Sequence, residues 1–357
     1  MLVLLTLLLV AAGFFIFSSA SLGLLAREGI SYSGVALKQF LVGFIVGGIV
    51  LVGVANIPFK FWQRHAFYIF LSTIILCIGV FIPHIGFAHG GAHRWINIGS
   101  YTFQPSELLK IGAIIYFAAW LAATKDGVKS FKFGALPLYI IIGITGALLL
   151  KQPDTGTFMV IFAALVAMFV SAGGRWRHLG LLFLACVIGF AVLATIRPYF
   201  MARFTTFLDP SHDALGSGYQ IQQSLIAIGS GGLIGRGFGQ SIQKFNFLPE
   251  PIGDSIFAVM SEEFGFIGGI TLIVLFVAFA LRGFKIAARV NDSFGMLMIV
   301  GLITAITAQA FINIGSMLSV LPLTGIPLTF VSHGGTAMLV ALAEVGMVLN
   351  ISKIQKS

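Results

Sequence analysis

Long apolar segments alternate with short polar ones along almost the whole chain. The apolar segments run for about 17 to 25 residues, the length that an α-helix needs to cross about 30 Å of hydrocarbon. They show no strand-like alternation of apolar and polar residues. The pattern therefore predicts an all-α membrane protein with about ten transmembrane helices, at residues 2–25, 36–54, 66–82, 106–123, 134–150, 156–172, 179–196, 255–281, 294–320 and 333–351.

The connections between these segments are short, except for two. One runs from 83 to 105, and the other, at 197–254, is longer than fifty residues. A loop of that length is too long for a simple connector and is a place where function concentrates. We therefore expect a single transmembrane domain over 1–357, with a large extracytoplasmic loop at 197–254 between the seventh and eighth crossings.

Composition agrees with this pattern and adds a direction. The chain is 58% hydrophobic and only 9% charged, and its mean hydropathy is +1.02, whereas soluble domains are about one quarter charged. With the N-terminus inside, the predicted cytoplasmic connections and tail hold twelve Lys and Arg residues, and the short outer loops hold three. Because basic residues are retained in the cytoplasm, we expect a multi-pass membrane protein with both termini cytoplasmic. The net charge of +9 thus reflects topology, and we expect no nucleic-acid partner.

The carboxylates show the opposite bias. Of the twelve acidic residues, only Asp126 and Asp292 fall in predicted cytoplasmic loops, and the others lie in outer loops or within helices. A charge inside a crossing is unfavourable by several kcal/mol at the centre and tends to face a cavity or a partner. The distribution indicates a polar interior that opens outward.

Asp254 stands immediately before an apolar helix. It can cap that helix, a contribution of about 1 kcal/mol, or it can act as a catalyst, and the residues alone leave both open. Glu250 precedes it in the same loop. Glu262 lies two turns further on, roughly 12 Å along the same face, where it could line a cavity beneath Asp254.

Two further polar pairs begin helices on the outer side. Glu107 and Lys110 are neighbours on one helical face, as an ion pair that holds helices together or as substrate contacts. Lys151 and Asp154 flank a turn, and Asp154 can cap the next helix or bind a ligand. The glycine-rich segment 229–239 lacks the strand before it and the Gly-Lys-Ser/Thr end of a phosphate loop, so we expect no nucleotide.

Eight segments in this order resemble the SEDS proteins, the RodA, FtsW and SpoVE group. They are 94–99 (RWINIG), 103–110 (FQPSELLK), 151–157 (KQPDTGT), 219–224 (YQIQQS), 247–250 (FLPE), 254–259 (DSIFAV) with Glu262 and Glu263, 321–328 (LPLTGIPL) and 331–335 (VSHGG). Segments 251–253, Ser255 and His333 depart from the family pattern. The resemblance covers nearly the whole chain and leans slightly towards FtsW.

The resemblance implies an inverting peptidoglycan glycosyltransferase in a bacterial cytoplasmic membrane. It polymerises lipid II into glycan strands at the outer face of that membrane and releases undecaprenyl diphosphate. It implies that Asp254 is catalytic, that Glu107 and Lys110 matter for function, and that a class B penicillin-binding protein is the partner, besides membrane lipids. It also suggests assistance by a divalent cation, Mg²⁺ or Mn²⁺, although no Asp-x-Asp metal motif occurs and the ligands stay unknown.

General chemistry extends this expectation. A carboxylate such as Asp254 can take the proton from the attacking sugar hydroxyl, and a diphosphate leaving group needs positive charge nearby. The candidates for that charge are Lys110, Lys151, Arg203, Arg236 and Lys244. Buried carboxylates in a helical bundle also fit a lipid-linked precursor flippase or other transporter, and a non-enzymatic scaffold for cell division or elongation stays open as well.

Overall fold

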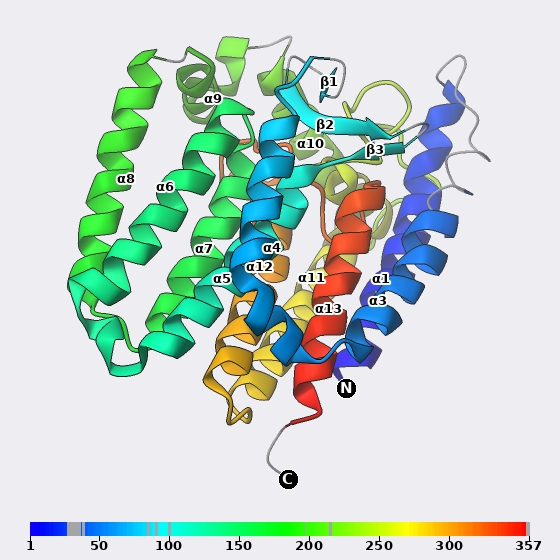
Figure 1. The fold of residues 1–357 in the computed structure, drawn as a ribbon. Helices are drawn as coiled ribbons and strands as arrows, with labels where there is room; N and C mark the ends of the chain where they lie inside the picture. The colour runs from blue at the N-terminus through cyan, green and yellow to red at the C-terminus, as the bar shows by residue number, and fades with distance from the viewer. Residues whose placement is uncertain are drawn as a thin grey trace. The chain divides into compact units, whose positions relative to one another are not determined.

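A computed structural model describes residues 1–26, 37, 40–83, 86–89, 92–98, 101–196, 198–213 and 216–354. The predicted helix start at Ala36 and the basic residues Arg27 and Lys356 lie outside this part. In chain order and with the labels of Figure 1, the elements are α1 (Leu2–Ala20), η1 (Ser21–Ala26), η2 (Phe40–Val46), α3 (Gly47–Asn56), α4 (Phe59–Gly79), β1 (Gly86–His89), β2 (Ala92–Ile98), β3 (Tyr101–Phe103), α5 (Pro105–Thr124), η3 (Lys125–Lys129), η4 (Phe131–Ala135), α6 (Leu136–Lys151), α7 (Thr155–Ser171), α8 (Trp176–Ile196), α9 (Pro198–Leu208), η5 (Pro210–Asp213), α10 (Ser217–Ser230), α11 (Ile256–Ala287), α12 (Ser293–Met317) and α13 (Gly335–Ser352).

The predicted membrane crossings coincide with helices. Among the described residues, seven helical segments are long and apolar enough to cross a membrane. Three shorter apolar helices, Gly43–Asn56, Thr155–Ser171 and Trp176–Val192, stand where the other three crossings are predicted. The all-helical polytopic fold is therefore confirmed. One boundary differs clearly, because α4 begins at Phe59 rather than at residue 66 and includes the charged Lys60 and Arg64, which hydropathy assigns to a loop.

The helices form two compact units. One consists of Met1–Ile45, Ala185–Phe279 and Gln309–Gly335, and the other of Val46–Leu184, Ala280–Ala308 and Thr336–Ser357. In the second unit α5 packs against α4, α6 and α7, which lie side by side in Figure 1. The single transmembrane domain expected over 1–357 stays a prediction.

A small antiparallel sheet, which hydropathy does not predict, occupies the connection before α5. Strands β1, β2 and β3 pair in sequence order, with Trp95 opposite Phe87 and Asn97 opposite Thr102. Strand β2 contacts α5 (Figure 1). Within the loop predicted at 197–254, the chain is also ordered, as the helices α9, η5 and α10.

Helix α11 is broken at Gly265, where φ is 65° and ψ is −164°. In an intact helix the amides of Phe266 and Ile267 would donate to the carbonyls of Glu262 and Glu263. Here the glycine-rich loop after α10 supplies all four partners. The bonds are Phe266 N to Gly232 O (2.9 Å), Ile267 N to Leu233 O (3.1 Å), Arg236 N to Glu262 O (3.0 Å) and Gly237 N to Glu263 O (2.9 Å).

This insertion explains why the loop is rich in glycine. A Cβ atom on Gly235 would lie 2.1 Å from the Glu263 carbonyl oxygen, and Gly235 has a φ of 82°. A Cβ on Gly265 would lie 2.4 Å from the Gly235 nitrogen. The two backbones can meet only because both side chains are absent.

We expect Gly235→Ala to destabilise the protein by about 1–3 kcal/mol, because alanine combines an unfavourable positive φ with a clash against backbone. Thermal unfolding of the detergent-solubilised protein measures this loss. Gly143→Ala in α6 is the matched control, because a Cβ there meets nothing within 4 Å. Equal melting temperatures for the two variants would contradict the proposed packing.

Candidate functional site

Asp254 closes a tight loop directly before α11. The amides of Gly253 and Ser255 both donate to the Glu250 carbonyl, at 3.0 and 3.2 Å, and Glu250 itself has a φ of 45°. The backbone therefore turns sharply just before the helix. This turn presents the Asp254 side chain at the loop rather than within α11.

Hydrogen bonds from α12 and from residues 332 and 333 hold three successive residues of this loop. The Asn313 side chain on α12 donates from Nδ2 to the Asp254 carbonyl and to the Ile326 carbonyl, both at 2.8 Å. The Ser332 hydroxyl donates to the Gly253 carbonyl at 2.6 Å, and the His333 amide donates to the Ile252 carbonyl at 2.7 Å. Three successive carbonyls are thus fixed, so the position of Asp254 does not depend on its own carboxylate.

The sequence reasoning misses Asn313 and Ser332. A signal for Asn313 was available, since a buried amide within an apolar helix is rare and usually has a partner. The departures from the family pattern at 251–253 and His333 leave this support intact, because it uses backbone atoms at both places. The His333 ring stacks on Phe17 with centroids 5.7 Å apart.

One oxygen of the Asp254 carboxyl makes no hydrogen bond within the described part of the chain. Oδ1 is buried and has no hydrogen-bond partner among the described residues. Burial raises the pKa of Asp254 to about 6, and the nearby Glu250 carboxylate acts in the same direction, while a hydrogen bond from Gln220 and the charge of Arg203 oppose them. A carboxylate with this pKa is ionised at neutral pH and is a better proton acceptor than an ordinary aspartate.

Arg203 brings a cation to the same neighbourhood. It lies on α9, is half-buried, and donates from Nη1 to the Leu323 carbonyl at 2.8 Å. Its charge acts on Asp254. Glu250, Asp254 and Arg203 are thus the predicted site residues that the structure brings together, with Gln220 as an addition.

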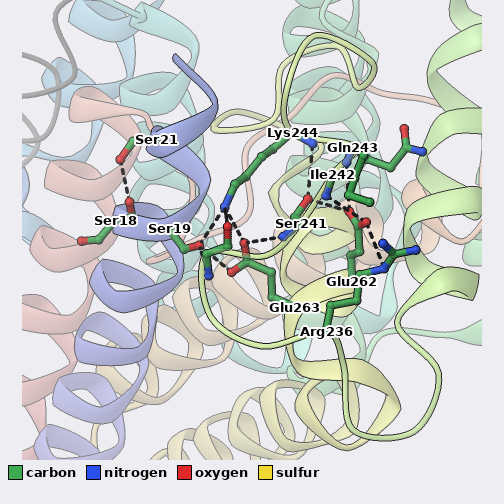
Figure 2. Close-up of polar contacts among 11 residues, drawn as sticks. Ser18, Ser19, Ser21, Arg236, Ser241, Ile242, Gln243, Lys244, Glu262 and Glu263 are labelled. Carbon is green, nitrogen blue, oxygen red and sulfur yellow. Dashed lines mark hydrogen bonds and ion pairs between the residues drawn. The ribbon is translucent and has the colours of Figure 1, made fainter. Parts of the chain in front are cut away.

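Three other predicted residues form a second cluster in the same unit, together with Glu263 (Figure 2). Lys244 is fully buried, and its Nζ lies 2.7 Å from Glu263 Oε1. Glu262 accepts from the Ser241 hydroxyl at 2.5 Å and from the Ile242 amide at 3.1 Å. Its carboxylate is therefore occupied by the loop at 241–244 rather than open to a cavity.

Ser19 on α1 completes this cluster. Its hydroxyl donates to Glu263 Oε2 at 2.5 Å and accepts from Lys244 Nζ at 3.2 Å, as Figure 2 shows. Arg236 is 38% exposed and lies 3.5 Å from Glu262 through Nε. Glu262, Glu263 and Lys244 thus fasten the loop to α11 and α1, and Arg236 keeps part of its guanidinium at the surface.

The remaining predicted residues belong to the other compact unit. Lys110 Nζ lies 2.9 Å from Glu107 and 3.4 Å from Glu344 on α13, and all three side chains are buried. The sequence pattern predicts the Glu107–Lys110 pair but not its extension to Glu344. The set ties α5 to α13, because removal of one partner would leave an uncompensated charge buried.

Asp154 caps α7. Its Oδ1 accepts from the Thr157 amide at 3.2 Å, and its Oδ2 accepts from the Ser106 hydroxyl at 2.9 Å. The capping interpretation is therefore confirmed. Arg94 donates to the carbonyls of Gln152 and Pro153 in the same turn, whereas Lys151 is exposed and lies over the Phe81 ring at 4.9 Å.

Comparison with known proteins places this architecture in a family. The sequence profile described as "Cell cycle protein", which groups FtsW, RodA and SpoVE, matches residues 1–357. The chain belongs to this family. It is 37% identical to stage V sporulation protein E of Bacillus subtilis over 356 residues, which cover 100% of this chain and 97% of the relative. The resemblance carried by the motifs is thereby confirmed.

A further relative and two solved structures are also similar to the chain over almost its whole length. The chain is 37% identical over 353 residues to a "probable peptidoglycan glycosyltransferase FtsW" of Nitrosomonas europaea, covering 97% of this chain and 90% of that one. A chain of the structure described as "Structural coordination of polymerization and crosslinking by a peptidoglycan synthase complex" superposes with a TM-score of 0.81 and 25% identity, covering 99% of this chain and 96% of that one. Thermus thermophilus RodA shares the fold, with a TM-score of 0.70 at 23% identity over 100% and 97% of the two chains. The present chain is thus a multi-pass membrane protein of this family.

Proposed function

We propose that the chain is a peptidoglycan glycosyltransferase that polymerises lipid II into glycan strands. The observation that supports this most directly is Asp254, a carboxylate with a raised pKa, one uncommitted oxygen and a loop fixed from outside. Names of relatives and the similarity to a chain of a peptidoglycan synthase complex support the same reaction.

In this mechanism Asp254 takes the proton from the 4-hydroxyl of the acceptor GlcNAc. That oxygen forms a bond to the anomeric carbon of the donor MurNAc, the bond from this carbon to the diphosphate oxygen breaks, and the configuration inverts. Undecaprenyl diphosphate leaves with the bonding electron pair. A general base contributes typically 10² to 10⁴-fold, and Arg203 offers positive charge to the departing diphosphate.

A divalent cation, Mg²⁺ or Mn²⁺, is compatible with these residues. No three His, Cys, Asp or Glu side chains gather into a metal site in the described part of the chain. Magnesium, however, needs only one or two carboxylates when substrate phosphates supply further ligands. Glu250, which is exposed beside Asp254, would hold it and leave Oδ1 of Asp254 for the proton; the cation would neutralise diphosphate charge.

The wider setting belongs to the same proposal. The charge asymmetry supports a bacterial cytoplasmic membrane with both termini in the cytoplasm and the chemistry on the outer face. The structural relative in a synthase complex supports a class B penicillin-binding protein as partner. The names of the relatives favour division or sporulation over elongation, and the position of a fluorescently tagged copy in the cell tests this choice.

Purified protein in proteoliposomes containing lipid II tests the reaction itself. We expect glycan strands on a gel and release of polyprenyl diphosphate, without movement of fluorescent lipid II between leaflets. Transbilayer movement without polymer would instead support a flippase. Absence of both, with a penicillin-binding protein still bound, would support a scaffold.

The pKa of Asp254 predicts the pH dependence of this reaction. Because the base must be deprotonated, kcat/KM should fall as the pH drops through about 6. Glu250→Gln removes a like charge that raises this pKa, so the acid limb should move to lower pH, whatever happens to the maximal rate. A pH profile of initial rates, recorded for the wild type and for Glu250→Gln, measures the acid limb of each protein. If the acid limb of Glu250→Gln lay at the same pH as that of the wild type, Glu250 would have no influence on the proton transfer.

A further inference from the structure

An apolar groove runs along the outside of the broken helix α11, within the same unit as Asp254. It encloses about 330 Å³, at the lower end of the range of about 300–1,000 Å³ for ligand pockets. Its floor is formed by Phe257, Ser261, Gly265 and Gly269, all of which are buried. The Ser261 hydroxyl is the one polar side-chain group among the lining residues.

Exposed apolar residues form the walls of this groove. Phe266 is 63% exposed and Ile270 is 42% exposed, on the second half of α11, and Leu318 follows α12. On the opposite wall, α10 contributes Ile228 and Gly229. The whole lining is uncharged, and α11 is a membrane-crossing segment, so an occupant from the bilayer must be a hydrocarbon chain.

The break in α11 creates the groove. Because the loop after α10 takes over the hydrogen bonds at Gly265, the helix is kinked there, beside the glycines of that loop. Gly229 and Gly232 on the other side also lack side chains, and a Cβ on either would meet nothing within 4 Å. Without side chains at Gly229 and Gly232, the groove stays open between α10 and the second half of α11.

The position of the groove favours one kind of hydrocarbon. Its lining begins at Phe257, one helical turn after Asp254, and continues to Ile273, which is roughly 24 Å of helix at 1.5 Å per residue if the break is ignored. A substrate whose diphosphate reacts at Asp254 must place its lipid tail in hydrocarbon near that point. We infer that this groove binds the polyprenyl tail of the lipid-linked sugar; this inference rests on the proposed function.

Binding can be tested without turnover. A polyprenyl diphosphate with a diazirine on its tail should label peptides within 257–273 of the full-length protein in nanodiscs, and unlabelled polyprenyl diphosphate should compete. Gly229→Leu places a side chain in the groove and should reduce labelling at least about tenfold, since excluding two methylenes from an apolar site already costs about that factor. Gly143→Leu is the control, because its side chain also meets open space but on α6, and it should label normally.

The catalytic assay supplies a second readout. In Gly229→Leu the KM for lipid II should rise towards that of a farnesyl-tailed analogue, while the rate with the short analogue stays that of the wild type. Competition by phospholipid as effective as by polyprenyl diphosphate, or labelling that Gly229→Leu leaves unchanged, would overturn the inference. Either of these results would leave the proposed function in place, because polymerisation by the wild type is measured separately. Labelling of a protein that makes no polymer would instead refute the proposed function alone.

Discussion

Asp254→Asn is expected to abolish glycan-strand formation by the purified protein while the fold remains. Asparagine has nearly the same shape, but its amide cannot accept the proton of the attacking hydroxyl, so the rate should fall by about 10² to 10⁴-fold. The loop should stay in place because Asn313, Ser332 and His333 hold it through backbone carbonyls. Gel analysis of products from lipid II measures the loss.

The same variant must be shown to be folded. Its melting temperature in detergent should match that of the wild type, and it should still bind lipid II. Glu250→Gln serves as a comparison, because it removes a neighbouring carboxylate but keeps the base, so the activity that remains should show an acid limb displaced to lower pH. Polymer formation by Asp254→Asn at the wild-type rate would assign the proton transfer to another group.

Lys244→Met is expected to cause the largest loss of stability, about 3–5 kcal/mol in the free energy of unfolding. Lys244 is fully buried, and its ammonium faces Glu263 at 2.7 Å and the Gly239 carbonyl at 2.9 Å. Methionine fills the space but leaves the Glu263 carboxylate buried without its cation. Thermal and denaturant unfolding in detergent, together with the yield of monodisperse protein, measure the effect.

A double variant distinguishes charge from packing. Lys244→Met combined with Glu263→Gln removes both charges and should recover most of the lost stability, because the remaining polar groups can still bond to Ser19 and Ser241. Lys151→Met is the surface comparison and should change the melting temperature little, since Lys151 is exposed. If the double variant were as unstable as Lys244→Met alone, packing of the lysine stem would account for the loss.

Hydropathy predicts most of the fold because the bilayer imposes a length on every apolar segment. It cannot see Gly265, since glycine between Phe264 and Phe266 disturbs neither the composition nor the length of α11. The break depends on four hydrogen bonds to a distant loop, which no local pattern encodes. The short strands β1 to β3 are missed for a similar reason, because their stability comes from pairing with one another.

The candidate site follows the same division. Residue chemistry marks Asp254, Glu250 and Arg203, because charges are rare in this chain and each one needs an explanation. The supporting residues Asn313 and Ser332 are polar but neutral, and they act on backbone atoms, so their partners can be known only from three-dimensional contacts. Glu262 shows the converse case, in which a charged residue suspected of facing a cavity is used by its own loop.

The broken helix also has a consequence for biosynthesis. A helix that opens its backbone in hydrocarbon loses several kcal/mol for each polar group left without a partner. In this chain the segment that satisfies those groups precedes α11 and therefore leaves the ribosome first. When α11 enters the membrane, the partners for its exposed amides and carbonyls have already been made, so the direction of translation itself favours correct closure of the break.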